Sequence, residues 1–184
     1  MRPRTIATAF ALVALACDSS GPAMSHVRLL LTDAPGPDVQ SAVVYVSRAY
    51  LVPGDDGNPV DLSTTPQQHD LLQLQNGVTA LLGSATIPAG DYSQLRLVVD
   101  SARLTLVDGA TFDDGSITRA MRVPSGAESG IKVSFPGQLH LPAGSATLTV
   151  DISVADNFVF QGPPSGPYGV HFTPHLKGTT QTAP

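Results

Sequence analysis

Apolar and polar residues alternate along most of this chain, in short runs that end at Gly, Pro, Asp or Asn. In the run SAVVYVSRAYLVP at 41–53, Val43, Tyr45 and Ser47 would share one face of an extended segment. In SATLTVDISV at 145–154, Thr and Asp alternate with Leu, Val and Ile. A period of two predicts antiparallel strands with one face in contact with solvent.

Most of the apolar segments predict strands, about eight or nine in total. The one helix candidate, 77–83, is short and bounded by glycines, so we interpret it as a helical turn or a loop. The segments that carry the alternation or a β-branched apolar run are 26–33, 41–53, 59–63, 68–74, 80–88, 93–109, 110–124, 130–137, 138–142, 145–161 and 168–178.

Gly-containing turns separate these segments. PGDDGNP, from Pro53, and TFDDGS, from Thr111, contain Asp-Gly steps, which are typical of hairpin tips. The stretches at 87–97 and 141–150 share the pattern apolar-Pro-Ala-Gly followed by an alternating run. We interpret the shared pattern as the same way of entering a strand, in preference to an internal duplication.

The strand pattern predicts an all-β fold, an antiparallel two-sheet β-sandwich. Strands of unequal length, and a long strand pair around Asp100, favour two packed sheets over a barrel. Gly 17, Pro 16 and only 14% charged residues agree with many short strands and turns. We expect a single domain over 26–178, followed by a C-terminal tail at 179–184.

The first residues have the pattern of an export signal. Arg2 and Arg4 precede the uncharged stretch 5–16, which as a helix would be roughly 18 Å long, against about 30 Å of bilayer hydrocarbon. The following Ala16-Cys17 resembles the lipobox of bacterial lipoproteins. The resemblance implies a signal peptide at 1–16, a lipidated Cys17 and a flexible tether at 17–25; the alternative is a plain signal peptide with an unmodified cysteine.

Charge argues against nucleic acid as a partner. The chain has 10 basic and 15 acidic residues, and removal of 1–16 takes away two arginines, so the net charge changes from -5 to 8 − 15 = -7. No run of Lys or Arg is present to displace the counterions of a polyanion. We therefore expect no nucleic acid as a partner. The resemblance to a lipobox implies an exported, membrane-anchored lipoprotein of the bacterial cell envelope.

Nucleophile motifs are missing from the sequence, which has no G-x-S-x-G and no S-x-x-K with its companion motifs. GAESG at 126–130 has the wrong spacing and predicts a loop before a strand. An enzyme would need residues assembled from distant strands, such as Asp100 with His69 or His140. We expect no catalytic residue and no cofactor.

Candidate metal ligands fall into two groups. His171 and His175 lie on either side of Pro174, which disfavours a helix, and in an extended strand they would be roughly 13 Å apart, too far for one ion. One of them could still join a metal site completed by His69 or His140. Asp33 and Asp38 could contribute to a calcium site at one end of the fold. A glycan groove would need aromatic platforms, and the chain has no Trp and four Tyr, namely Tyr45, Tyr50, Tyr92 and Tyr168.

Three stretches together resemble the DUF4382 family of bacterial and archaeal envelope proteins, a domain of unknown function that is often found on lipoproteins. They are LLLTDAP at 29–35, HDLLQLQNGVTALLGSATIPAGDYSQLRLVVD at 69–100 and VPSGAESGIKV at 123–133. The resemblance covers about 26–178, implies an immunoglobulin-like or transthyretin-like sandwich, and supplies no catalytic residue. In the family's closing strand, His175 replaces an expected aliphatic residue.

The residues that carry this resemblance have structural interpretations. Asn76-Gly77 and Gly90 suit unusual backbone angles, and Tyr92 with Arg96 could tie a loop to the end of a sheet. We therefore expect a non-catalytic envelope lipoprotein that presents its β-domain to a protein or polymer. The alternative is a module that binds calcium, zinc or a glycan at one end of the sandwich.

Overall fold

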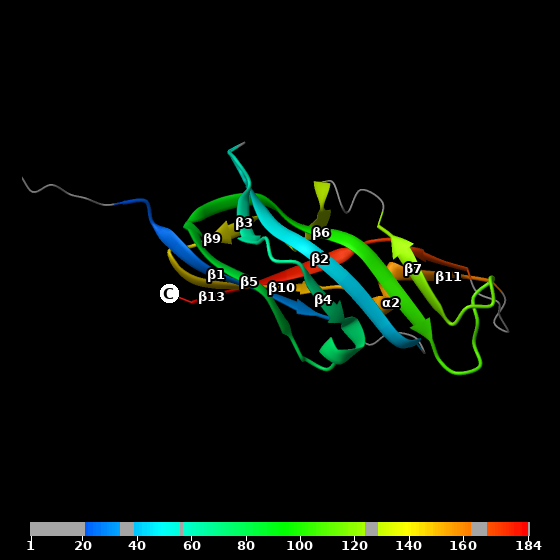
Figure 1. Ribbon diagram of the computed structural model, residues 1–184. Coiled ribbons are helices and arrows are strands. Elements are labelled where there is room, and N and C mark those ends of the chain that lie inside the picture. Colours follow the sequence, from blue (N-terminus) through cyan, green and yellow to red (C-terminus); the bar gives the residue numbers. More distant parts are fainter. Residues whose placement is uncertain (1–20, 34–38, 56, 124–128, 163–168, 184) are drawn as a thin grey trace, which may run out of the picture.

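The computed structural model describes residues 21–33, 39–55, 57–123, 129–162 and 169–183. Most of these residues form β-strands, and the two helices that lie wholly among them have four residues each. Cys17, Asp38 and Tyr168 lie outside the described residues. The elements, in chain order (Figure 1), are β1 (Met24–Thr32), β2 (Val39–Pro53), β3 (Val60–Ser63), β4 (Gln67–Asp70), η1 (Leu71–Leu74), β5 (Ala80–Pro88), β6 (Gly90–Leu106), β7 (Thr118–Arg122), β8 (Ile131–Ser134), β9 (Leu139–Leu141), β10 (Gly144–Asp151), α2 (Val154–Asn157), β11 (Phe158–Gln161), β12 (Gly169–Phe172) and β13 (Leu176–Ala183).

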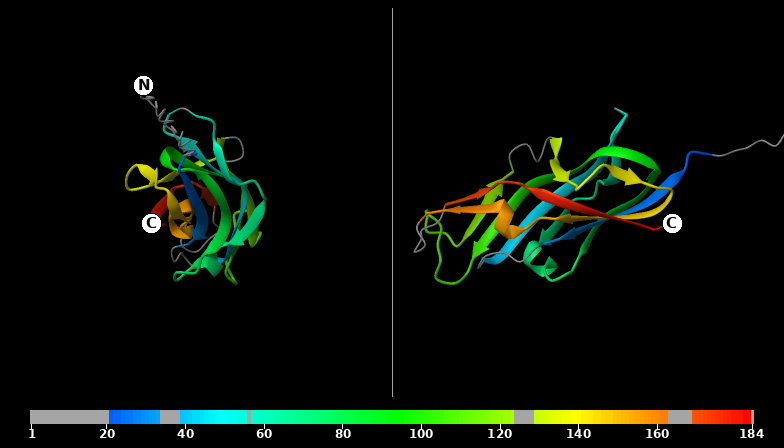
Figure 2. Two further views of the ribbon diagram at one scale, coloured as in Figure 1. Left: turned by 90° about the vertical axis from the view of Figure 1, so that its left-hand side faces the viewer. Right: turned by 180° about the vertical axis from the view of Figure 1, so that it is seen from behind.

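Eleven strands form one hydrogen-bonded sheet. Its main path runs β3-β2-β6-β8-β13-β10-β1-β5, with β4 paired to β2, and β7 and β9 paired to β6. The pairs β1–β10 and β8–β13 are parallel, and the other pairs are antiparallel. β11 and β12 form a separate two-stranded sheet. Figure 2 (left) shows the strands arranged around a central core, so that the sheet is nearly a barrel.

The predicted all-β class is confirmed, whereas the two-sheet sandwich is not confirmed. One continuous path of strands takes the place of two separate layers. The two longest strands, β2 and β6, explain this curvature, because their ladder contains four register shifts. Bulges of this kind bend a strand and increase its twist, which lets a single sheet curl toward closure.

Alternating side chains of β1 and β10 build the centre of the core. Val27, Leu29 and Leu31 are fully buried, and each pairs in parallel register with a buried apolar residue of β10. The intervening residues of β1 are exposed or half-buried. The period of two in the sequence therefore matches one face packed inside the barrel and the other in contact with solvent.

The outermost strands of the path, β3 and β5, meet without forming a ladder. A Cβ atom at Gly83 of β5 would lie 2.5 Å from the carbonyl oxygen of Leu62 and 2.7 Å from the Cβ of Ser63. Next to this contact, Gln67 Nε2 donates a hydrogen bond to the carbonyl oxygen of Leu82 at 2.6 Å. The barrel thus closes by close backbone packing and a side-chain hydrogen bond.

Several turns match the sequence interpretation. The two Asp-Gly stretches connect β2 to β3 and β6 to β7, both antiparallel pairs. Asn76 and Gly77 have φ angles of 58° and 84°. Gly90, with φ 150°, begins β6, and Gly144, with φ 110°, begins β10, so the shared Pro-Ala-Gly pattern does mark entry into a strand.

Three segments differ from the predictions. Residues 77–83 contain no helix: β5 begins at Ala80, and the helical turn η1 lies earlier, capped by the Asp70 side chain, which accepts a hydrogen bond from Leu72 N. β1 begins at Met24, before the expected domain start at 26. The expected tail at 179–184 belongs, up to Ala183, to β13, because this segment pairs with β10 along its length.

We predict that Gly83→Ala lowers the free energy of unfolding by about 1–3 kcal/mol, because the new methyl group would overlap backbone atoms that cannot move aside independently. Gly137→Ala is the matched control, since a Cβ there meets nothing within 4 Å. Urea denaturation of both variants measures the effect. Equal stability of the two variants would show that the packing of β3 against β5 tolerates a methyl group at position 83, and that this contact does not restrict how the barrel closes.

Candidate functional site

Asp33, one of the predicted metal ligands, is a buried structural residue at the end of β1. The residue is 4% exposed. Oδ1 accepts a hydrogen bond from Val154 N at 2.9 Å, and Oδ2 accepts one from Gln75 Nε2 at 3.2 Å. The side chain therefore connects the end of β1 to the first turn of α2 and to the segment after η1.

The two predicted histidine ligands have separate surroundings. His171, on β12, has Nε2 3.2 Å from Gln161 Oε1. His175 donates its backbone N–H to Asn157 Oδ1 at 2.6 Å, and its Nδ1 lies 3.0 Å from the carbonyl oxygen of Thr173. Within the part of the chain that the structure describes, no three His, Cys, Asp or Glu side chains gather closely enough to hold a metal ion.

Sequence reasoning missed two buried polar residues in the same region, Ser153 and Asn157. Ser153 caps α2 and accepts a hydrogen bond from Asp156 N at 3.3 Å. Asn157 is fully buried, donates from Nδ2 to the carbonyl oxygen of Ser153 at 2.8 Å and accepts from Thr173 N. The Ser-x-x-Asp spacing at 153–156 is the signal for a helix start that could have identified the cap.

The residues considered for an enzyme site have other partners. Asp100 Oδ1 accepts a hydrogen bond from Ser47 Oγ at 2.9 Å on the outer face of the sheet. His140 Nδ1 lies 2.7 Å from Asp91 Oδ1. His69 pairs with Val44 in the β2–β4 ladder and therefore points toward the inside of the sheet.

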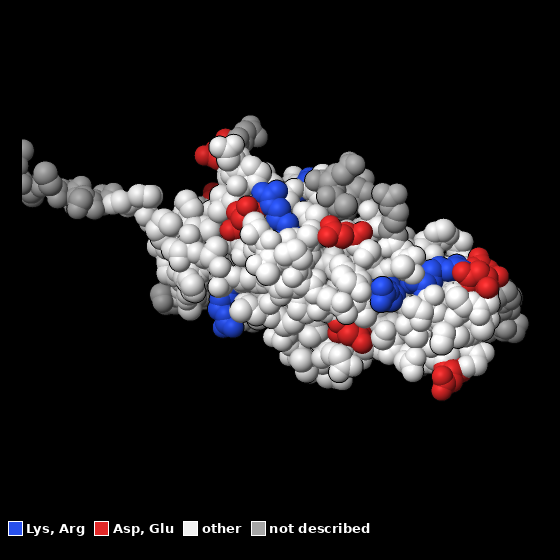
Figure 3. Space-filling view, viewed as in Figure 1, with Lys and Arg blue, Asp and Glu red and all other residues white. Residues whose placement is uncertain are grey.

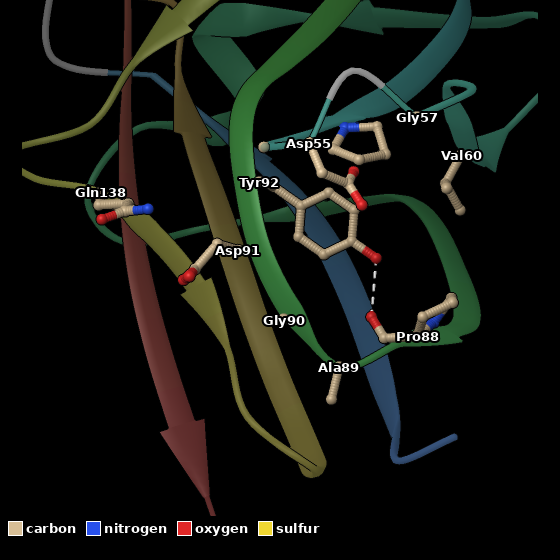
Figure 4. A pocket seen from close by; sticks show the side chains of 11 residues that line it. Asp55, Gly57, Val60, Pro88, Ala89, Gly90, Asp91, Tyr92 and Gln138 are labelled. Atoms are coloured by element: carbon tan, nitrogen blue, oxygen red, sulfur yellow. Dashed lines mark hydrogen bonds between the residues drawn. The ribbon is translucent and has the colours of Figure 1, made fainter. Parts of the chain in front are cut away.

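An open hollow of about 600 Å³ lies where the β2–β3 loop faces the β5–β6 turn, and we call it the β5–β6 hollow (Figure 4). Its volume is in the range of small-ligand sites. It lies at the end of the barrel where β1 begins, because Met24 pairs with Pro88. Its lining residues are Pro53, Gly54, Asp55, Gly57, Val60, Pro88, Ala89, Gly90, Asp91, Tyr92 and Gln138.

Tyr92 is the central side chain of the hollow. Its hydroxyl donates a hydrogen bond to the carbonyl oxygen of Pro88 at 2.7 Å, drawn in Figure 4, and Tyr92 as a whole is 4% exposed. Burial, followed by the nearby Asp55 carboxylate, raises the pKa of Tyr92. The hydroxyl therefore remains protonated at neutral pH and acts as a donor that fixes the β5–β6 turn.

Hydrogen bonds hold both sides of the hollow. Gly54 N donates to the carbonyl oxygen of Asp91 at 3.0 Å, and Ala89 N donates to the carbonyl oxygen of Ala23 at 2.8 Å. Asp55 lies beside the Tyr92 ring, whereas Asp91 points to the other side of β6 (Figure 4). The described lining residues include two carboxylates and no Lys or Arg, so the hollow disfavours anions.

Arg96 and Tyr50 connect a loop to the sheet on the other side of β6. Arg96 Nη1 donates to the carbonyl oxygen of Ser129 at 2.8 Å, and the Tyr50 hydroxyl donates to the same oxygen at 2.6 Å. The interpretation of Tyr92 and Arg96 as residues that tie loops to the sheet is confirmed. GAESG at 126–130 precedes β8, as predicted, although residues 126–128 lie outside the described part.

These observations define the chain as an all-β, nearly barrel-shaped domain. Most of its candidate site residues form hydrogen bonds to other residues of the chain. The chain belongs to the DUF4382 family, because the profile of this family, described as a domain of unknown function, matches residues 24–170. No curated protein sequence matches the chain. No helix within the described residues is both long and apolar enough to cross a membrane.

One solved structure is similar at a low level. It is a candidate cell adhesion protein from Bacteroides ovatus ATCC 8483, with 9% sequence identity and a TM-score of 0.24. The match covers 84% of this chain and 44% of that protein, so the chain spans less than half of its length. A likeness this weak identifies no shared site.

We predict that acid destabilises the protein through His69. Its Nε2 is buried without a hydrogen-bond partner among the described residues, and burial lowers the pKa of its imidazole below the ordinary value of 6.5. The folded state therefore favours neutral His69, and this stability is present above pH 6.5 and is lost as the pH falls through the lowered pKa.

Melting temperatures between pH 7.5 and 5 test this expectation. His69→Leu should reduce the loss of melting temperature over this range, whereas His171→Ala, at an exposed histidine, should leave it as in the wild type. An unchanged acid-dependent loss in His69→Leu would assign the effect to other groups.

Proposed function

We propose that this protein is a non-catalytic lipoprotein of the bacterial cell envelope, which presents its β-domain to a protein or polymer. The observation that carries the proposal is the spacing between Cys17 and the fold: β1 begins at Met24, 24 − 17 = 7 residues after the cysteine. A lipid on Cys17 would hold the domain on a short tether.

The tether would orient the domain. Seven extended residues span at most about 24 Å, so the start of β1 would remain near the bilayer surface. The β5–β6 hollow lies at this end of the barrel, because Pro88 pairs with Met24. The β6–β7 hairpin and α2 lie toward the opposite end and would face away from the membrane (Figure 1).

We predict that Cys17→Ser releases the protein from the membrane fraction, because the lipid would be the attachment. Wild type should take up a labelled fatty acid and remain with membranes, whereas the variant should lose the label and become soluble or be secreted. Ser20→Ala, three residues later, is the control and should behave as wild type. A Cys17→Ser protein that stays in membranes with unchanged gel mobility would contradict the lipid anchor.

A second candidate function is a module that binds a small ligand or ion at one end of the fold. The observation that favours it is the β5–β6 hollow, with its volume of about 600 Å³ and the Asp55 carboxylate beside Tyr92. This end is opposite to the one that holds Asp33, His171 and His175. A ligand bound there would lie close to the membrane surface if Cys17 carries a lipid.

Thermal melts with calcium, zinc or EDTA test the ion-binding form of this alternative. A ligand that binds only the folded state at 100 times its dissociation constant adds about 2.7 kcal/mol of stability. We expect no rise with either ion, because Asp33, His171 and His175 each have other partners, and in the hollow the Asp91 carboxylate contacts His140, which leaves Asp55 alone among the described lining residues. A reproducible rise that EDTA reverses would contradict this expectation and favour an ion site.

A further inference from the structure

The outer face of β4, β2 and β6 carries a group of polar side chains around one aromatic ring. Tyr45, in the middle strand, pairs directly with Gln68 of β4 and with Ser101 of β6. Its sequence neighbours Val44 and Val46 are buried, so Tyr45 points outward. The ring is half-buried and leaves part of its surface to solvent.

A bulge in β6 adds Asp100 to this group. Tyr45 pairs with Ser101, but the next residue of β2, Val46, pairs with Val99, so Asp100 is the extra residue in β6. Bulges often redirect a side chain near functional sites. Here the Asp100 carboxylate is exposed, and one of its oxygens accepts a hydrogen bond from Ser47 Oγ at 2.9 Å.

Arg103 places a donor over one face of the Tyr45 ring, next to the lining of the hollow. Its guanidinium carbon lies 5.8 Å from the centre of the Tyr45 ring, and Arg103 forms no ion pair with the described residues. By contrast, Arg48 and Arg119 are both paired with aspartates. The amide of Gln68 likewise has no side-chain hydrogen bond to the described residues.

These side chains border a shallow hollow of about 200 Å³, which we call the Tyr45 hollow. It is lined by Tyr45, Val46, Pro66, Gln67, Gln68 and Asp100. The Gln67 side chain is used for barrel closure, so the ring, the Gln68 amide and the Asp100 carboxylate are its available groups. Figure 3 shows charges of both signs scattered over this face, separated by uncharged surface.

We propose that the Tyr45 hollow binds a neutral polysaccharide. A sugar ring has an apolar face of C–H groups that packs on an aromatic ring, and its hydroxyls both donate and accept hydrogen bonds. The carboxylate of Asp100 accepts, the guanidinium of Arg103 donates and the amide of Gln68 does both. The negative charge of Asp100 and the positive charge of Arg103 cancel, so this face favours an uncharged ligand over a polyanion or a polycation.

The inference deepens the proposed function, on which it rests, by naming the polymer class and the surface that contacts it. Three adjacent strands form this face, so an extended chain could lie across it. The hollow is shallow, which suits one or two sugar units of a longer polymer and not an enclosed monosaccharide.

Affinity electrophoresis of the purified full chain tests the proposal, with gels that contain dextran, mannan, xylan, galactan or the anionic control polygalacturonate. We expect at least one neutral polysaccharide to retard the wild type. Tyr45→Ala should weaken this binding at least about tenfold, because it removes the stacking surface. Tyr45→Phe should retain it within about threefold, and Gln68→Ala should weaken it by about three- to tenfold.

Ile117→Ala is the matched control, since it removes an exposed apolar side chain far from the hollow, in the connection between β6 and β7. Melting curves establish that each variant is folded. Retardation by polygalacturonate alone, no retardation in any gel, or equal binding by wild type and Tyr45→Ala would each overturn the proposal. None of these results bears on the lipid anchor, which fractionation of Cys17→Ser measures separately.

Discussion

The contact between β3 and β5 is the constraint on which the rest of the domain depends. A sheet of eight successive strands has two open edges, and an open edge exposes unpaired backbone groups and the core behind it. The missing side chain at Gly83 lets β5 approach the Leu62 carbonyl, and Gln67 then bonds the Leu82 carbonyl. Leu62 and Leu82 both remain buried, so the interior is covered on this side without a continuous ladder.

The sheet can bring β3 and β5 together only if it curves between them. The β2–β6 ladder provides this curvature. This pair is the longest in the sheet, and its four register shifts interrupt an otherwise regular antiparallel pairing. Irregularities of this kind bend a strand and increase its twist. The shift at Tyr45 and Val46 also directs Asp100 to the outer face, so the distortion that curves the sheet shapes the surface around Tyr45.

Local features of the fold were predictable from the sequence, while its connectivity was not. The angles at Asn76 and Gly77, the hairpins at Asp-Gly steps and the inward face of each strand follow from nearby residues. The parallel pairing of β1 with β10 joins segments far apart in the sequence. Alternation indicates which face of a strand is buried, but it does not indicate which strand lies beside it, so it cannot distinguish one curved sheet from two layers.

The candidate site residues show the same contrast between local features, which the sequence predicts, and long-range contacts, which it does not. Pro174 excludes a helical pair of histidines, and the structure agrees: His171 lies on β12 and His175 lies after it. Asp33, an acidic residue at the end of a predicted strand, is from the sequence alone a candidate calcium ligand. Burial decided its role instead, because only tertiary structure brings the N–H of Val154 to its carboxylate.

Buried polar residues organise the end of the barrel around α2. Asp33, Ser153 and Asn157 are all buried, and their hydrogen bonds link the end of β1, the start of α2 and the segment before β13. Such groups are costly to bury unless they are paired, so together they specify one arrangement of these segments. A helix of four residues has little stability alone, and this network therefore holds it in place. The segments around α2 are thus positioned by internal hydrogen bonds rather than by the stability of the helix itself.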